Sequence, residues 1–222
     1  MTLEDSTFYQ GPYRKIQDSG ISGWYVKKSH SKLEMHLPPP DPKPFDSILE
    51  VGGNIGEHIQ FIEANFKSYT LSDLRFSNLK FLDNRINFTV ADVHILPFKS
   101  NAFDRTILTC LLHHLSDPFK ALKEIDRVTK KNGLVSILLP CDPGLAYRTA
   151  KKIGVRNKYL NLGITNPEFF HYQQHRNHFP GLESLIQEVW KNSQIDNLYW
   201  PINFKSWNMN LFTVWQIRKC DK

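Results

Sequence analysis

The sequence has few cysteines and no long apolar run. Cys110, Cys141 and Cys220 are widely spaced, and no C-x-x-C pair indicates a zinc site or a redox couple, so we expect reduced thiols. No apolar run approaches the roughly 18 residues that a membrane-spanning helix needs. Residues 1–10 also lack the basic start and apolar stretch of a signal peptide. These absences predict a cytoplasmic protein without a transmembrane segment.

The residues that are present suit one folded α/β domain. The chain has 222 residues, of which 41% are hydrophobic and 13% aromatic, and it contains no repeat or low-complexity tract. Lys and Arg exceed Asp and Glu by 28 − 22 = 6. Such an excess is found in nucleic-acid-binding proteins and in enzymes that handle anionic small molecules. Composition therefore leaves both classes open.

Hydrophobic periodicity predicts alternating strands and helices after a proline-rich linker. A short helix is expected over residues 24–37, and the prolines between 38 and 44 end it and form the linker. Apolar residues at helical spacing from Ile55 to Phe66 predict a helix after the first strand. The predicted strands cover residues 47–51, 69–74, 86–91, 106–112 and 134–139. This alternation implies a mostly parallel sheet with helices on both faces.

The helix before the fifth strand has marked boundaries. Asp117 is the predicted N-cap, Pro118 suits the first turn, and residues 130–133 are predicted to end the helix. A later helix is expected over 182–190. It is followed by strands at 195–202 and 211–217 that pair as a terminal hairpin.

Residues 141–180 form a segment too long for an ordinary connection between a strand and a helix. We expect this segment to form a small cap over a ligand site. The predicted organisation is thus an N-terminal helical segment, residues 1–45, and one domain, residues 46–222, that contains the cap as an insertion.

A glycine-rich turn follows the first strand, at the sheet edge where open α/β folds bind ligands. In Glu50-Val-Gly-Gly-Asn-Ile-Gly, the glycines at 52, 53 and 56 let the backbone approach a ligand closely. Glu50 places an acid at the start of the turn, where it would repel a pyrophosphate, and the G-x-G-x-x-G spacing of a dinucleotide site is missing. A cationic sulfonium cofactor suits this turn better.

The turn resembles motif I of the class I S-adenosylmethionine-dependent methyltransferases, usually written E/D-x-G-x-G-x-G, with Asn54 in place of the middle glycine. Further segments between residues 47 and 140 look like the family's other signatures in the same order. They are Asp73, Asp92-Val93, Leu96-Pro-Phe, Phe103-Asp and Leu111-Leu-His-His-Leu. The resemblance implies a Rossmann-like α/β fold, with a mostly parallel seven-stranded sheet, a C-terminal antiparallel hairpin and helices on both faces.

The resemblance also implies S-adenosylmethionine as the cofactor and S-adenosylhomocysteine as the product. In the family, the acid at the position of Asp73 binds both ribose hydroxyls, the acid at Asp92 pairs with the adenine amino group, and the amide at Val93 binds a ring nitrogen. The expected cofactor contacts are Glu50, Gly52, Gly53, Asn54, Gly56, Asp73, Leu74, Asp92, Val93 and Cys110.

Methyl transfer mainly requires alignment of the acceptor with the methyl carbon and the sulfur. A base is needed only for a hydroxyl or a protonated amine, and histidine suits that task near neutral pH. His114 follows the fourth strand, His175 lies in the predicted cap, and Asp142 follows the fifth strand. We therefore expect His114, His175 and Asp142 to be the catalytic residues. The alternative role for the His113-His114 pair is a backbone contact at a helix entry.

The cap histidines at 171, 175 and 178 have a spacing that can bring side chains together on a helix, as in a metal site. No nearby carboxylate other than Glu168 completes a ligand set, and methyl transfer itself requires no metal. We therefore expect no metal ion.

No acid occurs between Asp142 and Glu168, whereas five basic residues do: Arg148, Lys151, Lys152, Arg156 and Lys158. This charge favours a small-molecule acceptor that is anionic, such as a phosphorylated metabolite, a nucleotide-linked sugar or a lipid-linked saccharide reached by peripheral membrane contact. A solvated basic helix face is the alternative. The C-terminal part faintly resembles small-molecule methyltransferases of surface-polysaccharide synthesis.

Three other functions stay open. An RNA methyltransferase would keep the cofactor, but the sequence offers no separate RNA-binding module, and we expect no stable nucleic-acid partner. A short-chain dehydrogenase would use Tyr147 and Lys151 in a Y-x-x-x-K pattern, but the Gly52 turn lacks that family's T-G-x-x-x-G-x-G motif. A non-catalytic scaffold is disfavoured because the acids expected to hold ribose and adenine are present. Oligomeric state is not indicated.

Overall fold

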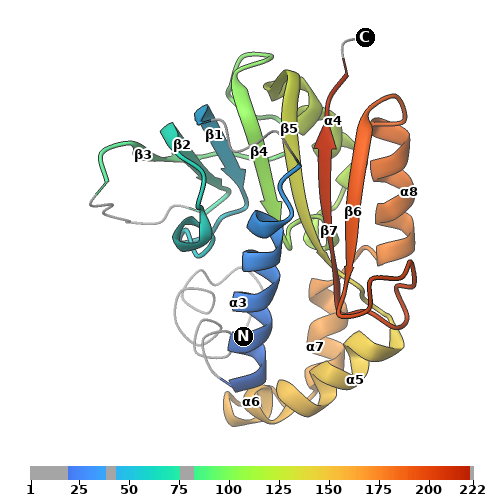
Figure 1. Ribbon diagram of the computed structural model, residues 1–222. Coiled ribbons are helices and arrows are strands. Elements are labelled where there is room, and N and C mark those ends of the chain that lie inside the picture. The colour runs from blue at the N-terminus through green and yellow to red at the C-terminus, as the bar shows by residue number, and fades with distance from the viewer. Residues whose placement is uncertain (1–19, 39–43, 76–82, 221–222) are drawn as a thin grey trace.

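A single seven-stranded sheet organises the part of the chain that the computed structural model describes, residues 20–38, 44–75 and 83–220 (Figure 1). Its strands follow the order β3-β2-β1-β4-β5-β7-β6. The first five are parallel, whereas β7 runs antiparallel to both β5 and β6. The predicted fold class is confirmed. The strands are β1 Phe45–Val51, β2 Phe66–Asp73, β3 Ile86–Val90, β4 Phe103–Thr109, β5 Thr129–Pro140, β6 Gln194–Trp200 and β7 Phe212–Arg218.

Helices cover both faces of this sheet. On one face α4 packs against α8 and β5, and on the other α3 packs against β5 and β7. None of the described helices is both long and apolar enough to cross a membrane. The helices are α3 Gly20–Met35, α4 Pro118–Val128, α5 Leu145–Gly154, α6 Arg156–Asn161, α7 Pro167–Gln174 and α8 Phe179–Val189, with 3-10 turns η1 Ile59–Phe61 and η2 Leu112–His114.

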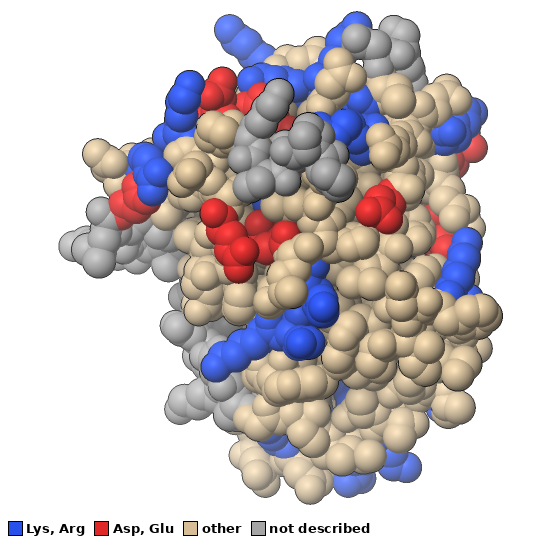
Figure 2. Space-filling model, in the orientation of Figure 1, with Lys and Arg blue, Asp and Glu red and all other residues tan. Residues whose placement is uncertain are grey.

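The positive charge is spread over several surfaces. Lys and Arg side chains gather over α3, which contributes Lys27, Lys28 and Lys32 (Figure 2). In the same view, the end of the molecule formed by α5, α6 and α7 shows Lys and Arg but no Asp or Glu side chains (Figure 2). The charge excess is therefore not confined to one basic patch.

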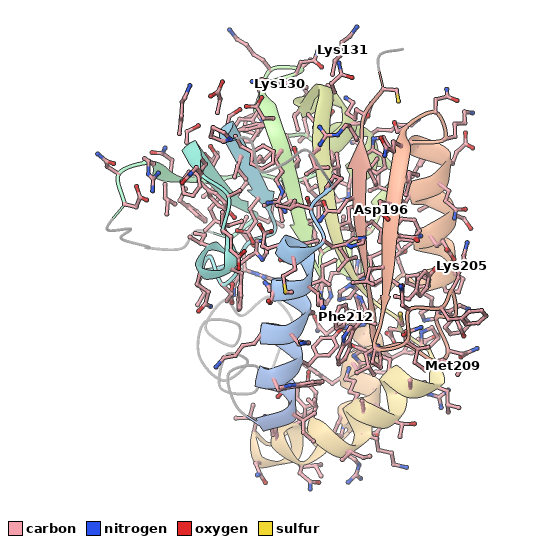
Figure 3. All side chains as sticks on the ribbon, viewed as in Figure 1. Lys130, Lys131, Asp196, Lys205, Met209 and Phe212 are labelled. Atoms are coloured by element: carbon pink, nitrogen blue, oxygen red, sulfur yellow. The ribbon has the colours of Figure 1, made fainter. Side chains whose placement is uncertain are left out.

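Alternation along the central strands divides their side chains between two cores. In β5, Val135 and Ile137 face the core that α4 and α8 cover, whereas Leu134 and Leu138 face the core beneath α3. Phe212, at the start of β7, packs edge-on against Tyr25 of α3 with ring centroids 5.6 Å apart (Figure 3). This apolar contact fixes α3 across the carboxyl ends of the parallel strands.

The start of α4 is as predicted, but its end is not. The Asp117 side chain accepts a hydrogen bond from the Lys120 amide, and Pro118 is the first helical residue. The helix stops at Val128 because β-branched Thr129 turns to extended backbone and pairs with Phe103 of β4. Residues 130–133, which we predicted to end the helix, therefore already belong to β5.

The helix predicted from Ile55 to Phe66 is wrong, since only the short turn η1 forms there and Phe66 begins β2. Asn54 and Gly56 have φ angles of 48° and 81°, in the left-handed region that a helix cannot include.

The fourth strand also ends earlier than predicted, at Thr109 rather than at residue 112. Cys110 has a φ of 52°, which turns the chain into η2. The other predicted strands and the helix at 182–190 agree with the structure to within a few residues, except that β5 starts five residues early. The predicted linker falls largely on residues 39–43, and the N-terminal segment up to residue 19 likewise lies outside the described residues.

A buried ion pair joins α3 to the centre of the sheet. The Arg105 guanidinium donates to both carboxylate oxygens of Glu34, at 2.9 and 2.7 Å, and both side chains are almost fully buried. His58 contacts the same carboxylate through Nε2 at 3.0 Å. Burial alone would raise the pKa of Glu34, but Arg105 and the hydrogen bond from His58 outweigh it and lower that pKa to about 2. Glu34 is therefore an ion inside the core.

Glu50, near the end of β1, is also buried, but no cationic side chain forms an ion pair with it among the described residues. It is 1% exposed, and the Tyr69 hydroxyl donates to its Oε2 at 2.6 Å. Burial raises the pKa of the Glu50 carboxyl from 4.5 to about 8, so the folded protein holds this group protonated at neutral pH.

We predict that neutralising either partner of the buried ion pair destabilises the protein. Glu34→Gln and Arg105→Met should each lower the free energy of unfolding by about 3–5 kcal/mol, because each leaves an unpaired charge in the core. The double variant should lose much less than the sum of both, as measured by urea unfolding followed by circular dichroism. Additive losses would show that the two charges do not interact.

A second prediction concerns Glu50→Gln, which mimics the protonated carboxyl at all pH values. Between pH 4.5 and 8 the folded wild type keeps a proton that the unfolded chain releases, so its free energy of unfolding falls with rising pH. Relative to the variant, the fall should be about 1.4 kcal/mol per pH unit in this window. Urea unfolding of both proteins at pH 5, 6, 7 and 8 measures this difference. A difference that is constant with pH would contradict the raised pKa.

Candidate active site

A cavity of about 630 Å³ lies at the carboxyl ends of the parallel strands. The segments that follow β1, β2 and β3 form one side of it, and η2 after β4, together with residues of α3, α5 and the connection from α7 to α8, forms the other. Its size falls in the range of roughly 300–1,000 Å³ that is typical of small-molecule sites. The loops at this edge carry most of the residues that the sequence singled out.

The turn after β1 approaches its neighbours so closely that only glycine fits. A Cβ on Gly53 would lie 2.1 Å from Leu71 Cδ1 and 2.8 Å from Glu50 Cδ. Gly52 has a φ of 71°, and a Cβ there would lie 2.6 Å from Leu111 Cδ1. The amides of both glycines donate to the Ser72 carbonyl, at 2.8 and 3.2 Å. The turn is thereby fixed to the end of β2 with its backbone along the cavity.

Asp73 at the end of β2 lines the cavity beside this turn. Its Oδ2 accepts from the Asn54 amide and its Oδ1 from the Arg75 amide, each at 3.0 Å. A carboxylate has about four acceptor positions, so these two bonds leave further positions for donors in the cavity. The backbone bonds fix the carboxylate without using up its capacity.

Asp92 and Val93 line the next part of the cavity wall, after β3. Oδ1 of Asp92 accepts from the amide and from Nδ1 of His94, at 2.9 and 2.7 Å. The backbone hydrogen bond from His94 is the main cause that lowers the pKa of Asp92, which is therefore ionised at neutral pH. Two carboxylates thus stand along one wall.

Eight of the ten expected cofactor contacts line the cavity, and two do not. Glu50 lies beneath the glycine turn and supports it, and its raised pKa removes the negative charge on which we based the exclusion of a pyrophosphate. Gly56 directs the chain into η1 with a φ of 81°. Cys110 lines the cavity as a thiol, since burial raises its pKa to about 12, and Leu74 is an exposed lining residue.

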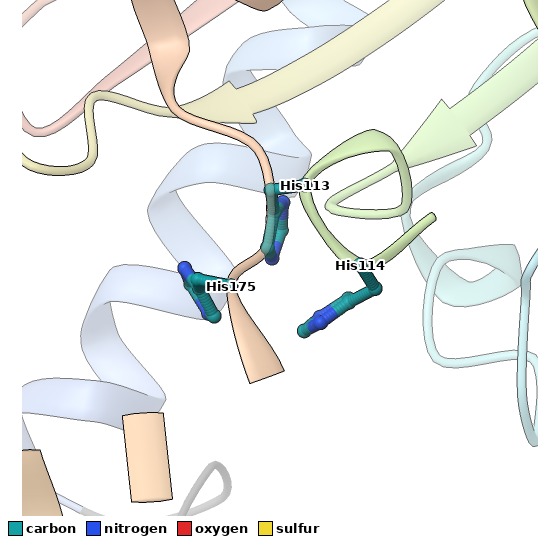
Figure 4. Close-up of side chains that lie close together, drawn as sticks. All are labelled: His113, His114 and His175. Carbon is teal, nitrogen blue, oxygen red and sulfur yellow. The ribbon is translucent and has the colours of Figure 1, made fainter. Parts of the chain in front are cut away.

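Three histidines from two segments meet on the opposite wall (Figure 4). His113 and His114 belong to η2, and His175 follows α7. The ring centroids lie 4.0 Å apart for His113 and His114 and 4.1 Å apart for His113 and His175. Burial lowers the pKa of all three rings, so each is neutral at pH 7.

Hydrogen bonds fix the proton position on two of these rings. Nδ1 of His114 donates to the Gln174 carbonyl, and Nδ1 of His175 donates to Oδ2 of Asp142, each at 2.8 Å. In both neutral rings the lone pair is consequently on Nε2. Asp142 is 5% exposed and lies behind His175, outside the cavity lining, so it positions the imidazole and does not face the cavity itself.

Asp142 also connects the cluster to Lys151 through His171. His171 contacts the same Oδ2 through Nε2 at 3.1 Å, and Nδ1 of His171 hydrogen-bonds to Nζ of Lys151. Burial lowers the pKa of Lys151 to about 7. Among the five basic residues between Asp142 and Glu168, only Lys151 lines the cavity, where Arg75 and Arg176 accompany it.

Sequence reasoning missed the contribution of α3 and of Arg75. Tyr25 and His30 line the cavity from α3, and both lie more than 20 residues before Gly52 in the sequence. No local pattern identifies such residues, because their place depends on how α3 packs across the sheet. Arg75 follows Asp73 by two positions, and this short distance in sequence could have predicted that Arg75 lines the same cavity.

Comparison with known proteins finds methyltransferases that resemble part of this chain. Residues 49–137 match the family model of a methyltransferase domain. The chain is 26% identical over 143 residues to a demethylmenaquinone methyltransferase of Chlamydia pneumoniae, covering 60% of this chain and 58% of that protein. It is 34% identical over 98 residues to a tRNA U34 carboxymethyltransferase of Campylobacter fetus, covering 40% and 35%. The chain thus spans little more than half of the first curated relatives it matches.

Solved structures agree with this match. The 1,6-didemethyltoxoflavin-N1-methyltransferase of Burkholderia thailandensis, solved with its substrate and S-adenosylhomocysteine, superimposes with a TM-score of 0.58 at 16% identity. The alignment covers 100% of this chain and 93% of that one. Residues 49–137 thus resemble a methyltransferase domain, and the strand order is that of the fold seen in these solved methyltransferases.

Proposed function

We propose that this protein transfers the methyl group of S-adenosylmethionine to a small-molecule acceptor within the 630 Å³ cavity. The observation that carries the proposal is the pairing of two walls in one cavity, with the glycine turn and two carboxylates on one side and neutral histidines on the other. The bound cofactor supplies an electrophilic methyl group on a cationic sulfur.

The first wall fits the cofactor. Asp73 keeps acceptor positions for the two ribose hydroxyls, and the ionised Asp92 is suited to the adenine amino group. The Val93 amide would bind an adenine ring nitrogen. The Gly52–Asn54 turn, with its backbone along the cavity, allows close approach of the remaining part of the cofactor, its methionine portion.

The second wall would hold the acceptor. Nε2 of His114 and Nε2 of His175 carry lone pairs at the cavity, and either can take the proton of an acceptor hydroxyl or ammonium group. Asp142 keeps His175 in the required tautomer and stabilises the ring when it becomes charged. The residues we named as catalytic thus act here as two bases and one positioning residue.

We further propose that the acceptor is a small anionic molecule. Arg75 and Arg176 line the same cavity as cations, and the partly protonated Lys151 can add a third positive charge when an anion binds, which suits a phosphorylated molecule. The names of relatives include both a quinone-pathway and a tRNA enzyme, so the comparisons do not choose between acceptor classes. The cavity's limited volume favours a small molecule over RNA.

The helices α5, α6 and α7 would serve as the cap over this site, since α5 and α7 contribute lining residues such as Lys151 and Gln174. A cytoplasmic location and a role in polysaccharide synthesis stay predictions. Calorimetric titration and a transfer assay test the central proposals.

We predict that Asp73→Asn weakens binding of S-adenosylhomocysteine by about 10- to 100-fold in isothermal titration calorimetry. The substitution keeps the size of the side chain but removes a charged acceptor, whose hydrogen bonds contribute about 1.5–3 kcal/mol. Asp196→Asn, on β6 and outside the cavity lining, is the matched control and should bind like the wild type. Equal affinities of all three proteins would exclude Asp73 from the cofactor site.

For the acceptor, we predict that a panel of sugar phosphates and nucleotide sugars contains a substrate that accepts a radiolabelled methyl group. Lys151→Met should then raise the KM for that substrate about tenfold, because one charged contact is lost, and leave S-adenosylhomocysteine affinity unchanged. Its neighbour Lys152 is exposed and does not line the cavity, so Lys152→Met serves as the control. Transfer to uncharged acceptors alone would contradict the anionic class.

A further inference from the structure

The histidine wall offers more lone pairs than proton transfer needs. One nitrogen each of His113, His114 and His175 can be chosen so that all three lie within 4.8 Å of one another (Figure 4). A single general base uses one lone pair. Three converging imidazoles are instead the donor set of a transition-metal site, in which imidazole nitrogens lie about 2.0–2.1 Å from the ion.

The hydrogen bonds around these rings have the pattern that orients metal ligands. Ligating histidines generally donate their second nitrogen to a carboxylate or a backbone carbonyl, which fixes the tautomer and the ring orientation. His175 donates Nδ1–H to Asp142 at 2.8 Å, and His114 donates Nδ1–H to the Gln174 carbonyl at 2.8 Å. In both rings Nε2 is thereby left as the donor atom for an ion.

His113 provides an independent sign of a missing ligand. The residue is 3% exposed, and its Nδ1 is a buried atom without a hydrogen-bond partner among the described residues. A buried polar atom without a partner costs free energy, and native structures seldom leave one so. A bound cation would satisfy this nitrogen directly.

We propose that His113, His114 and His175 bind a Zn²⁺ ion, with Asp142 and the Gln174 carbonyl as supporting groups. Three histidines leave one position of a tetrahedral ion open, and since all three residues line the cavity, that position would be accessible to an acceptor oxygen or to water. With the ion bound, the histidine lone pairs are ligands, and the ion takes over the role of making an acceptor hydroxyl more acidic.

This site differs from the one that sequence spacing suggested and that we disfavoured for want of a carboxylate. The structure brings in His113 and His114 from η2, far from the cap histidines in sequence, and Asp142 from the end of β5. Glu168 instead pairs with Arg156 at 3.6 Å. The ligand set could only be seen once these segments were folded together.

Titration with Co²⁺ tests the site, because cobalt replaces zinc in tetrahedral sites and absorbs visible light when bound. Chelator-treated protein should take up one equivalent of Co²⁺ with a tetrahedral spectrum that Zn²⁺ abolishes. His113→Gln and His175→Gln should lose this binding, whereas His36→Gln, whose ring contacts Asp196 outside the cavity, should keep it. Asp142→Asn should weaken it by about 10- to 100-fold.

Circular dichroism establishes that each variant is folded, and His114→Gln replaces His113→Gln if the latter is not. No Co²⁺ uptake by the wild type, or uptake that survives both histidine substitutions, would overturn the proposal. The metal titration does not depend on the proposed methyl transfer. A protein that binds Co²⁺ but not S-adenosylhomocysteine would support the metal site and contradict the cofactor assignment, and the reverse result would do the opposite.

Discussion

The close contact between the glycine turn and the side chains beneath it sets the shape of the cavity. Gly53 lies against Leu71 and the buried Glu50, and Gly52 lies against Leu111, so neither position has room for a side chain. The same turn is bonded to the end of β2 through the Ser72 carbonyl and through Asp73. Any shift of this turn would therefore move the Asp73 carboxylate as well as the turn's own backbone along the cavity.

The opposite wall depends on contacts between distant segments. Asp142 at the end of β5 holds His175 of the α7–α8 connection, and the backbone of His113 accepts hydrogen bonds from the amides of Arg176 and Asn177. In the core between α3 and β4, the Glu34–Arg105 ion pair fixes α3 across the sheet. The histidine side of the cavity is thus built by tertiary packing, whereas the side with the glycine turn is built by loops that directly follow strands. This difference explains why the sequence indicates the cofactor more clearly than the acceptor.

Local patterns predicted the sheet well, and they predicted which loops lie at the cavity edge. Strand ends can be read from apolar runs, and Asp73 and Asp92 stand directly at such ends, so their place at one edge of the sheet followed from topology. The helix expected after the glycine turn failed because Asn54 and Gly56 take left-handed backbone angles that periodicity does not register. Glu34 and Arg105 are 71 residues apart, and no local sequence pattern around either residue predicts that the two form an ion pair. The role of Asp142 behind His175 was missed for the same reason.

A crystal structure of the protein grown with S-adenosylhomocysteine tests the central claim most directly, because it locates the cofactor without reference to any acceptor. Our account predicts electron density for the ligand along the Gly52–Asn54 turn, with the ribose at Asp73 and the adenine beside Asp92 and Val93. Density at any other position would contradict the account, as would crystals grown with saturating ligand in which the cavity contains only water.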